Sequence, residues 1–580
     1  MHTLSLPLGK KKFKLLLFAV MLVCSLWFAL PKLVRADEVD PLDIEWEVVG
    51  NLVNAQGQPV EGALIEALVV QNGEEVVVAE DESQEDGSWA LALQEVPASM
   101  QVRISRAHYG SQTLTFTDEE LGLLRESGSL LTSTLVLERE LNAAFWASAA
   151  VFVFVLLVIA SERLHSTTAS LAAMSAIFLI SFVGGSISPD WFIFDFETAL
   201  SYINWEVIFL VMGMMIIIAV LERTGLFQWT AFQAYRLSGG RSWLLVLILI
   251  AVTAIASALL DNFTTMLLMT PISLQIALAI GINPFALIIP EVLASNVGGI
   301  STLIGTPTNI VIGAYANIGF SDFLINQTLG VLLALAALAG FVLFFYRKEW
   351  KKTSGGISER LYELLKKNGQ IRDKDGLIKS AIVFALVMVG FVLGERIHLV
   401  PAVPALIGAT LLFVWLRPDV NETIEAVDWT TLVFFMSLFI VIGAVQEVGL
   451  ISVIAAAMGR LVGDSLILAI VLVTFGVGTL STAIANIPLA ASMLPVVEFL
   501  SGSLPGASNK VLYYALSMGA AMGGNGLVIG AEANLVTSGI TEQAGHPISF
   551  KEFMRIGLPV TYITLAVGTL WLIVRFILFA

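Results

Sequence analysis

Cysteine and charged residues are scarce in this chain. A single cysteine, Cys24, occurs in 580 residues, which excludes an intrachain disulfide and any cysteine-rich metal site. Charged residues make up 13% of the chain against 57% hydrophobic residues, and the mean hydropathy is +0.85. Several apolar stretches reach the roughly 18 residues that a bilayer-spanning helix needs. The composition therefore predicts a polytopic membrane protein embedded in a lipid bilayer.

The groups that an enzyme or an ATP-driven pump would need are also lacking. There is no GxxxxGK[ST] phosphate loop and no nucleophile placed with a base. The histidines fall at predicted span ends, in loops or in the N-terminal part: His2, His108, His165, His398 and His546. We therefore expect no enzyme activity, no cofactor and no metal other than a bound sodium ion.

The net charge of -16 is unevenly distributed. Residues 37–141 hold 22 acidic residues against 4 basic ones, which leaves the remainder of the chain near neutral. This acidic segment argues against nucleic acid as a partner.

Residues 1–36 have the pattern of a signal peptide. The basic run "KKKFK" precedes the apolar run "LLLFAVMLVCSLWFAL", and "VRA" before Asp37 has some of the small-residue character of a cleavage site. An uncleaved signal anchor is the alternative. Either reading predicts that the segment after it is exported.

The exported segment, residues 37–140, has short alternating apolar runs divided by turn residues, among them "IEWEVVGNLV", "NGEEVVVA" and "SLLTSTLVL". This spacing predicts a small extracytoplasmic all-β sandwich. The order "GNLVNAQGQPVEGALIEAL" followed by "DGSWALAL" resembles the carboxypeptidase regulatory-like β-sandwich. Ligand binding and a spacer role are both open for it.

From residue 141 onward the chain reads as an all-α membrane domain. Two stretches, 242–282 and 463–503, are broken near the middle by "LDNFTT" and "IANIPLA" and are predicted to be re-entrant hairpins. The remaining apolar stretches give ten crossings: 142–160, 166–186, 204–221, 284–313, 325–346, 377–395, 400–416, 429–447, 510–538 and 556–579.

The basic residues indicate the orientation in the plasma membrane. With the N-terminal domain outside, seventeen lysines and arginines of residues 141–580 fall on the cytoplasmic side, ten of them in 347–379, and four fall outside. This is the asymmetry of the positive-inside rule.

The two halves of the membrane domain match each other. At an offset of 225 "NVGGISTLIGTPTNIV" aligns with "AMGGNGLVIGAEANLV", and at 224 Trp205 aligns with Trp429 and Asn262 with Asn486. Since five crossings are an odd number, the second half starts on the opposite side. The sequence predicts two inverted five-helix repeats, 141–346 and 377–580, joined by a cytoplasmic linker, 347–376. This is the architecture of a secondary transporter.

Polar residues inside the apolar stretches mark the expected site. Non-helical backbone at membrane depth is tolerated only where protein or a watery cavity surrounds it, so Asn262, Asn486 and the two Gly-rich runs indicate helix breaks. Asp261 is costly to bury unless it is paired or protonated, which makes it a functional candidate.

The same stretches carry a family resemblance. "SALLDNFTTMLLMTP", "SNVGGISTLIGTPTNIVIG", "ANIPLAASMLP" and "YALSMGAAMGGNGLVIGAEANLV" resemble the paired signatures of the ArsB/NhaD group of the ion transporter superfamily, in its P protein branch. The resemblance implies a site between the repeats near the midplane. The residues it assigns to substrate or ion binding are Asp261, Asn262, Thr264, Thr265, Ser295, Asn296, Gly298, Gly299, Ser301, Thr302, Gly305, Thr306, Asn309, Asn486, Pro488, Gly523, Gly524, Asn525, Gly530, Glu532 and Asn534.

The sequence departs from that branch at the second hairpin tip, which reads Ala485-Asn486 where Asp-Asn is usual. The expected function is a secondary active transporter of a small inorganic ion or anion, arsenite-like or other, coupled to protons or sodium. A sodium/proton antiporter and a passive channel are the alternatives, and the sequence is compatible with a homodimer. Close helix packing is the alternative role for the paired glycines.

Overall fold

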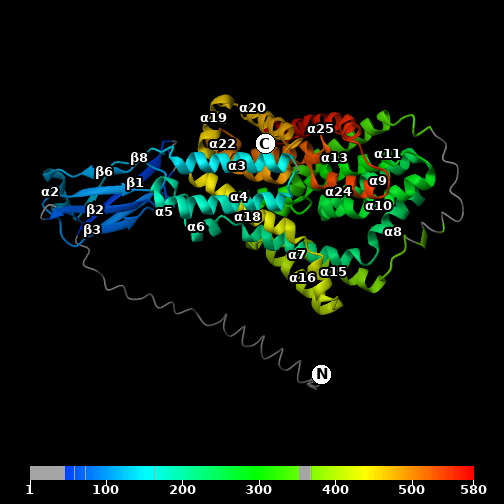
Figure 1. Cartoon of the computed structure of the whole chain (residues 1–580), viewed down its shortest axis with the longest axis horizontal. Coiled ribbons are helices and arrows are strands. Elements are labelled where there is room, and N and C mark those ends of the chain that lie inside the picture. Colours follow the sequence, from blue (N-terminus) through cyan, green and yellow to red (C-terminus); the bar gives the residue numbers. More distant parts are fainter. Residues whose placement is uncertain are drawn as a thin grey trace, which may run out of the picture. The chain divides into compact units, whose positions relative to one another are not determined.

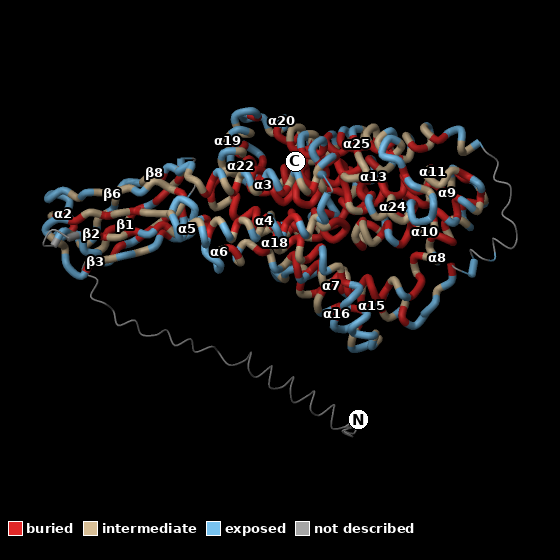
Figure 2. Tube along the Cα trace, in the orientation of Figure 1, coloured by how far each residue is buried: buried red, intermediate tan, exposed pale blue. Residues whose placement is uncertain are grey.

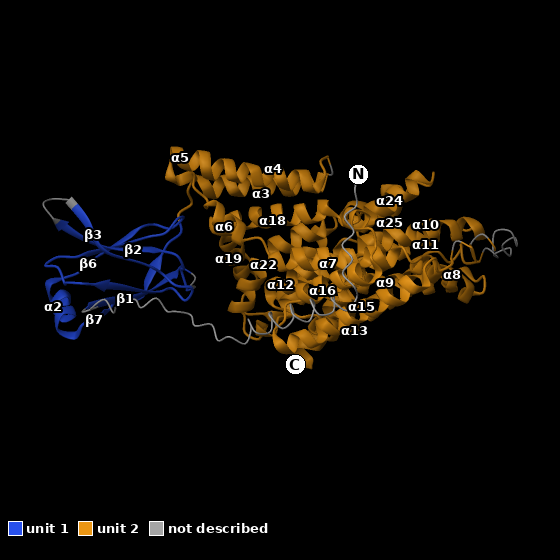
Figure 3. Cartoon of the chain, turned by 90° about the horizontal axis from the view of Figure 1, so that it is seen from below, with its two compact units in different colours: residues 1–139 blue, residues 140–580 orange. Residues whose placement is uncertain are grey.

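The computed structural model describes residues 46–579 except 56, 58, 72–73, 162, 352–362, 364–365 and 368. The expected signal peptide, with Cys24, lies outside the described residues. The chain divides into two compact units, Met1–Arg139 and Glu140–Ala580, coloured separately in Figure 3.

The described strands of the first unit form two four-stranded sheets. In one sheet β4 and β7 flank β1, which also pairs with β8, and the other has the order β3-β2-β5-β6. Alternate residues of β4, Trp89, Leu91 and Leu93, are buried, as the alternating sequence predicts. The strands are β1 Trp46–Asn54, β2 Leu64–Gln71, β3 Glu74–Glu82, β4 Ser88–Leu93, β5 Gln101–Ser105, β6 Gln112–Thr115, β7 Ser129–Leu131 and β8 Leu135–Leu137.

The expectation of an all-β unit misses one helix, α2 (Asp118–Ser127). The Thr117 hydroxyl accepts from the Glu120 amide at 3.3 Å, and the Glu120 carboxylate accepts from the Thr117 amide at 2.8 Å. That backbone bond holds the pKa of Glu120 below its ordinary value. The Thr-x-x-Glu pattern of a capping box is present in the sequence, and it specifies a helix start within a segment of strands.

The second unit begins with the first repeat, in which two apolar helices, α3 and α4, lie side by side (Figure 1). Its helices are α3 Ala143–Ser161, α4 Ser166–Phe178, α5 Gly185–Ile187, α6 Phe196–Ser201, α7 Trp205–Glu222, α8 Leu226–Ser238, α9 Ser242–Leu259, α10 Asn262–Ile280, α11 Phe285–Gly298, α12 Pro307–Ala316 and α13 Phe320–Phe345.

The second repeat follows the same order of elements. Its helices are α15 Lys374–Gly394, α16 Ala402–Leu416, α17 Val420–Glu425, α18 Trp429–Glu447, α19 Leu450–Val462, α20 Leu466–Val471, α21 Gly478–Ser481, α22 Asn486–Ser503, α23 Val511–Gly523, α24 Glu532–Gln543 and α25 Phe550–Ile573. A π-helical turn, Leu472–Val477, joins α20 to α21. Helices α8 and α19 both start after a left-handed glycine, Gly225 and Gly449.

The lengths of the helices agree with a membrane protein. Within the described ranges, nine helices are long and apolar enough to cross a bilayer. The stretch 284–313 consists of α11, a 3-10 turn and α12, and 510–538 consists of α23, a turn and α24, so both are broken helices as expected. The stretch 242–282 is a hairpin of α9 and α10.

The repeats pack reciprocally. Helix α4 packs on α18 while α16 packs on α7, and α10 packs on α24 while α12 packs on α22. Buried residues, red in Figure 2, predominate on α7, α11, α18 and α22, whereas α15 and α19 carry many exposed, pale blue residues. The polar breaks therefore lie in the interior of the domain.

Candidate functional site

The two Gly-rich runs form matching breaks in α11–α12 and α23–α24. After α11 the backbone makes a short 3-10 turn and becomes extended at Thr302 and again at Thr306, directly before Pro307 opens α12. The chain after α23 is extended at Leu527 and Ala531 before α24 begins. Each break leaves carbonyl groups without helical partners inside the protein.

One asparagine per repeat satisfies these carbonyls. The Asn309 side-chain amide donates to the carbonyls of Ile300 at 3.1 Å and Thr302 at 2.8 Å. The Asn534 amide donates to the carbonyls of Gly524 at 2.7 Å and Leu527 at 2.9 Å. The paired asparagines thus hold the two broken loops closed.

Asn296 joins the two repeats at the centre. Its amide donates to Asn525 Oδ1 at 2.9 Å and to Asn534 Oδ1 at 3.0 Å, and its own Oδ1 accepts from Asn262 at 2.7 Å. Asn262, at the first hairpin tip, is thereby tied to both broken helices. All four side chains are buried.

Serine hydroxyls tie the hairpins to the broken helices in both repeats. Ser257 donates to the Ser295 carbonyl at 2.8 Å and Ser481 to the Ala520 carbonyl at 2.7 Å. Gly298 and Gly523 lie where these helices touch, because an added Cβ would come within 2.5 Å of Ala254 Cα and 2.3 Å of the Gly478 carbonyl, respectively. Close packing therefore accounts for these two glycines.

The two hairpin tips differ. Asp261 caps α10: one carboxylate oxygen accepts from the Thr264 amide and the other from the Thr264 hydroxyl, both at 2.7 Å. Ala485 precedes α22 and offers no side-chain cap. Asn486 is buried and makes no side-chain hydrogen bond to the described residues. The asymmetry expected from the sequence is therefore present at the tips.

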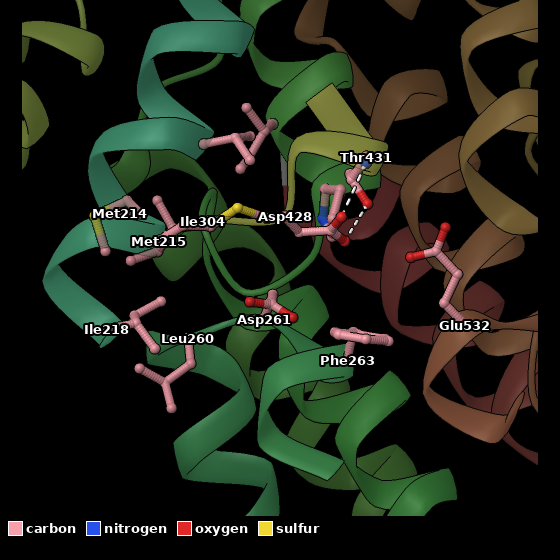
Figure 4. A pocket seen from close by; sticks show the side chains of 13 residues that line it. Met214, Met215, Ile218, Leu260, Asp261, Phe263, Ile304, Asp428, Thr431 and Glu532 are labelled. Carbon is pink, nitrogen blue, oxygen red and sulfur yellow. Dashed lines mark hydrogen bonds between the residues drawn. The ribbon is translucent and has the colours of Figure 1, made fainter. Parts of the chain in front are cut away.

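A small pocket of about 30 Å³ lies where α10, α12, α18 and α24 begin. Three carboxyl groups line it, Asp261, Asp428 and Glu532, and Figure 4 shows them from three different elements. Met214, Met215 and Ile304 are among the apolar residues that complete it. The described residues that line it include no lysine, arginine or histidine.

Asp428 is the site residue that the sequence analysis missed. It caps α18, with one oxygen accepting from the Thr430 and Thr431 amides, each at 3.1 Å, and the other from the Thr431 hydroxyl at 2.6 Å. A signal existed, because Asn204 occupies the matching position before Trp205 and caps α7 through the Val207 amide at 3.1 Å. The repeat alignment would have drawn attention to it.

Glu532 differs from both aspartates because the described residues provide no hydrogen-bond partner for its carboxylate. It occupies the first position of α24, where the free backbone amides of a helix start favour negative charge. Within the described part of the chain, the acidic residues do not converge as a metal-binding group. The arrangement suits separate carboxyl groups that each bind or release a proton.

Two larger cavities flank the small pocket. One, of about 540 Å³, shares Phe263, Asp428 and Glu532 with it and extends to His165 between α3 and α4. The other, of about 570 Å³, shares Ile310 and extends to Glu206 and the α15–α16 connection.

The flanking cavities are repeat-related. At the offsets of 224 and 225, Leu210 corresponds to Phe434 and Ile310 to Leu535, and each pair contributes one residue to each cavity. Cavity-lining residues come from the helix connections 161–167 and 395–401. In the topology predicted from the sequence, these connections lie on opposite sides of the membrane.

Of the predicted site residues, Asp261 and Glu532 line these cavities. Gly299 and Gly305 approach each other at the first break, and Thr265 and Thr306 keep buried hydroxyls without partners. The remaining predicted residues, whose binding role stays a prediction, belong to the hairpin tips and broken loops: Asn262, Thr264, Ser295, Asn296, Gly298, Ser301, Thr302, Asn309, Asn486, Pro488, Gly523, Gly524, Asn525, Gly530 and Asn534.

Comparison with known proteins gives consistent matches. Residues 154–506 match the CitMHS family, described as citrate transporter. A 46 kDa membrane protein of Mycobacterium leprae is 37% identical over 431 residues, which is 74% of this chain and 98% of that protein. The P protein of Homo sapiens is 30% identical over 515 residues, covering 75% of this chain and 60% of that protein. The YdaH transporter structure from Alcanivorax borkumensis covers 70% of this chain and 98% of its own, at 17% identity and a TM-score of 0.46.

Proposed function

Because the chain belongs to the CitMHS citrate transporter family and is a membrane transporter rather than an enzyme, we propose that it is a secondary active transporter coupled to protons through Asp261, Asp428 and Glu532. The observation that carries this proposal is the pocket in which these three carboxyl groups meet at the starts of helices from both repeats. Proton and cation compete for such carboxylates, so a sodium gradient is the second candidate for coupling.

The paired cavities support a carrier mechanism. A repeat-related cavity lies on either side of the small pocket, and rocking one repeat against the other would open the pocket to each side in turn. The pocket of about 30 Å³ has room for only a few water molecules, so the described residues form no wide aqueous pore between the cavities here. This disfavours the passive channel.

The electrostatics of the pocket support a small cargo of low negative charge. Three carboxyl groups and no basic side chain line it, so a polycarboxylate such as citrate would meet repulsion. The resemblance to ArsB/NhaD transporters supports arsenite, or sodium itself in a sodium/proton antiporter. A bound sodium ion, where present, would use these carboxylates together with backbone carbonyls.

Transport by purified protein in proteoliposomes tests the proposal. An imposed pH gradient should drive uptake of radiolabelled sodium or arsenite and of little citrate, and preloaded vesicles should show counterflow. Flux that saturates and shows counterflow identifies a carrier. Conductance without counterflow would identify a channel, and preferred uptake of citrate would contradict the inferred cargo.

The proposed orientation places the N-terminal unit outside the cell and the 347–376 linker inside. We expect Gln94→Cys, on an exposed turn of the first unit, to react with a membrane-impermeant maleimide in intact cells. Lys348→Cys, at the exposed start of the linker, should react only after permeabilisation. Both variants are made in a Cys24→Ser background. Equal labelling of the two in intact cells would refute the orientation.

A further inference from the structure

Glu291 is a buried acid that the cavities do not explain. It follows Pro290 in α11, and its side chain is 0% exposed. One carboxyl oxygen accepts from the Ser273 hydroxyl of α10 at 2.8 Å. The other oxygen, Oε1, is buried and has no partner in the described structure.

Among the residues that the structure describes, none around Glu291 supplies a countercharge. Every residue of α11 from Ala286 to Gly298 is buried, and Leu287, Ile288 and Val292 around it are apolar. Of the helices packed on α11, α9 and α10 contain no ionisable side chain. Helices α23 and α25 add three tyrosines, and the charged side chains on α13, α24 and α25, none of which bonds to Glu291, are Asp322, Glu532, Glu542, Lys551, Glu552 and Arg555.

These contacts determine the protonation state of Glu291 in this conformation. A carboxylate with one hydrogen bond and no cation, removed from water, is far costlier to bury than the neutral acid. In the neutral acid, the Ser273 hydroxyl donates to the carbonyl oxygen, and only the O–H group on Oε1 lacks a partner, which costs far less than a buried charge. The group is therefore held as a carboxylic acid.

Glu291 is linked to the pocket through α10 and α11. Buried polar side chains follow one another down α10, from Asn262 at the tip through Thr265 and Thr270 to Ser273. On α11, Asn296 lies five residues after Glu291, more than a helical turn of about 5.4 Å, and bonds to Asn262. The two helices are thus bonded at the tip by Asn262 and Asn296 and further away by Ser273 and Glu291.

A cavity lies at the same level of α10, on the face of the helix opposite to Ser273. This cavity of about 340 Å³ is lined by Pro271 and Gln275, on either side of Ser273 in sequence, and by Arg372 of the linker. A displacement of α10 against α11 would break the Ser273 bond and change the surroundings of the carboxyl group.

Resting on the proposed function, we propose that Glu291 is a second proton-binding site, separate from the cavity carboxyls, that gains and loses one proton as α10 moves against α11 during transport. The step is protonation of the carboxylate by a proton from water and its reversal. Glu291 does not line the small pocket or the cavities that flank it, so it acts as a coupling residue.

Infrared difference spectroscopy of the purified full chain tests the protonation. The wild type should show a carboxylic acid C=O band at neutral pH that exchanges slowly in D₂O, and Glu291→Gln should lose this band. Glutamine has nearly the same shape and keeps an acceptor for Ser273, so the variant should fold. Ser273→Ala keeps the acid and should shift the band. A spectrum of Glu291→Gln equal to that of the wild type would overturn the proposal.

Flux against pH separates a coupling role from a structural one. With sodium and arsenite as probes, one at a time, net flux in Glu291→Gln should lose one titration step of its pH profile, and Ser273→Ala should move the midpoint of that step. A wild-type pH profile in Glu291→Gln would reject Glu291 as a coupling site while leaving the proposed function intact. Absence of flux in the wild type would reject the proposed function, and the infrared band would still decide the state of Glu291.

Discussion

Asp261→Asn should remove one titration step from the dependence of flux on pH while leaving the protein folded and inserted. Asparagine is as good a helix cap as aspartate, so its Oδ1 would keep the bond from the Thr264 amide. One of the three titratable groups at the small pocket would be lost. Coupling free energies between two bound ligands correspond to about a 5- to 150-fold change in affinity. We expect the effect of protonation at Asp261 on the apparent affinity for the cargo to lie in that range and to be lost in the variant. Initial flux against pH and sodium at matched expression measures it.

Thr264→Ala is the matched control for Asp261→Asn. It removes the hydroxyl bond to Asp261 and keeps both the carboxylate and the amide bond. If Asp261 acts through its charge, this variant keeps its coupling. Unchanged coupling in Asp261→Asn would leave Asp261 as a helix cap alone.

Ala485→Asp adds a carboxylate where Asp261→Asn removes one, in the cavity that residues of both tips line. It should therefore alter the ion stoichiometry of transport or the apparent affinity for the ion.

Gly299→Ala should destabilise the membrane domain strongly. A Cβ on Gly299 would lie 2.3 Å from the Gly305 carbonyl oxygen, which belongs to the backbone and cannot rotate away. Overpacking of this kind costs about 1–3 kcal/mol of unfolding free energy. The thermal midpoint of the detergent-solubilised protein and the yield of monodisperse protein report the loss.

The second repeat supplies a graded comparison. A Cβ on Gly524 would lie 3.1 Å from the Gly530 carbonyl, so Gly524→Ala should cost less than Gly299→Ala. Gly340→Ala is the control, since nothing lies within 4 Å of the added methyl group on α13. In a helix interior that change should stabilise by about 0.5–1 kcal/mol. Equal midpoints for all three variants would show that the first break is looser than its geometry indicates.

The order of elements could be predicted from local sequence patterns. Long apolar runs specify the helices whatever surrounds them, because backbone amides in a bilayer must be bonded internally. The Gly-Gly pairs and Asn309 and Asn534 recur at a constant offset, so the two breaks were visible before any contact was known. Helix α2 is a local feature that the prediction missed. Its capping signal is present in the sequence, but the alternating pattern of the segments around it predicts strands only.

The residues that meet at the small pocket could not be predicted in the same way. Asp428 reads as an ordinary helix cap in the sequence, and only the packing of α18 against the first repeat brings it to the same pocket as Asp261. Asn296 bonds to Asn534, 238 residues away in the chain, a contact that no local sequence pattern shows. Glu291 could equally have faced water.

The sequence by itself determined that this protein crosses the membrane, that it is built from two related halves, and where each half breaks, because these depend on hydrophobicity and on backbone groups within a few residues. Only the tertiary structure decided which polar side chains line a cavity, which hold the broken loops and which are buried without a countercharge. That choice depends on how each helix is rotated about its axis, and contacts with helices some 200 residues away in the chain set the rotation.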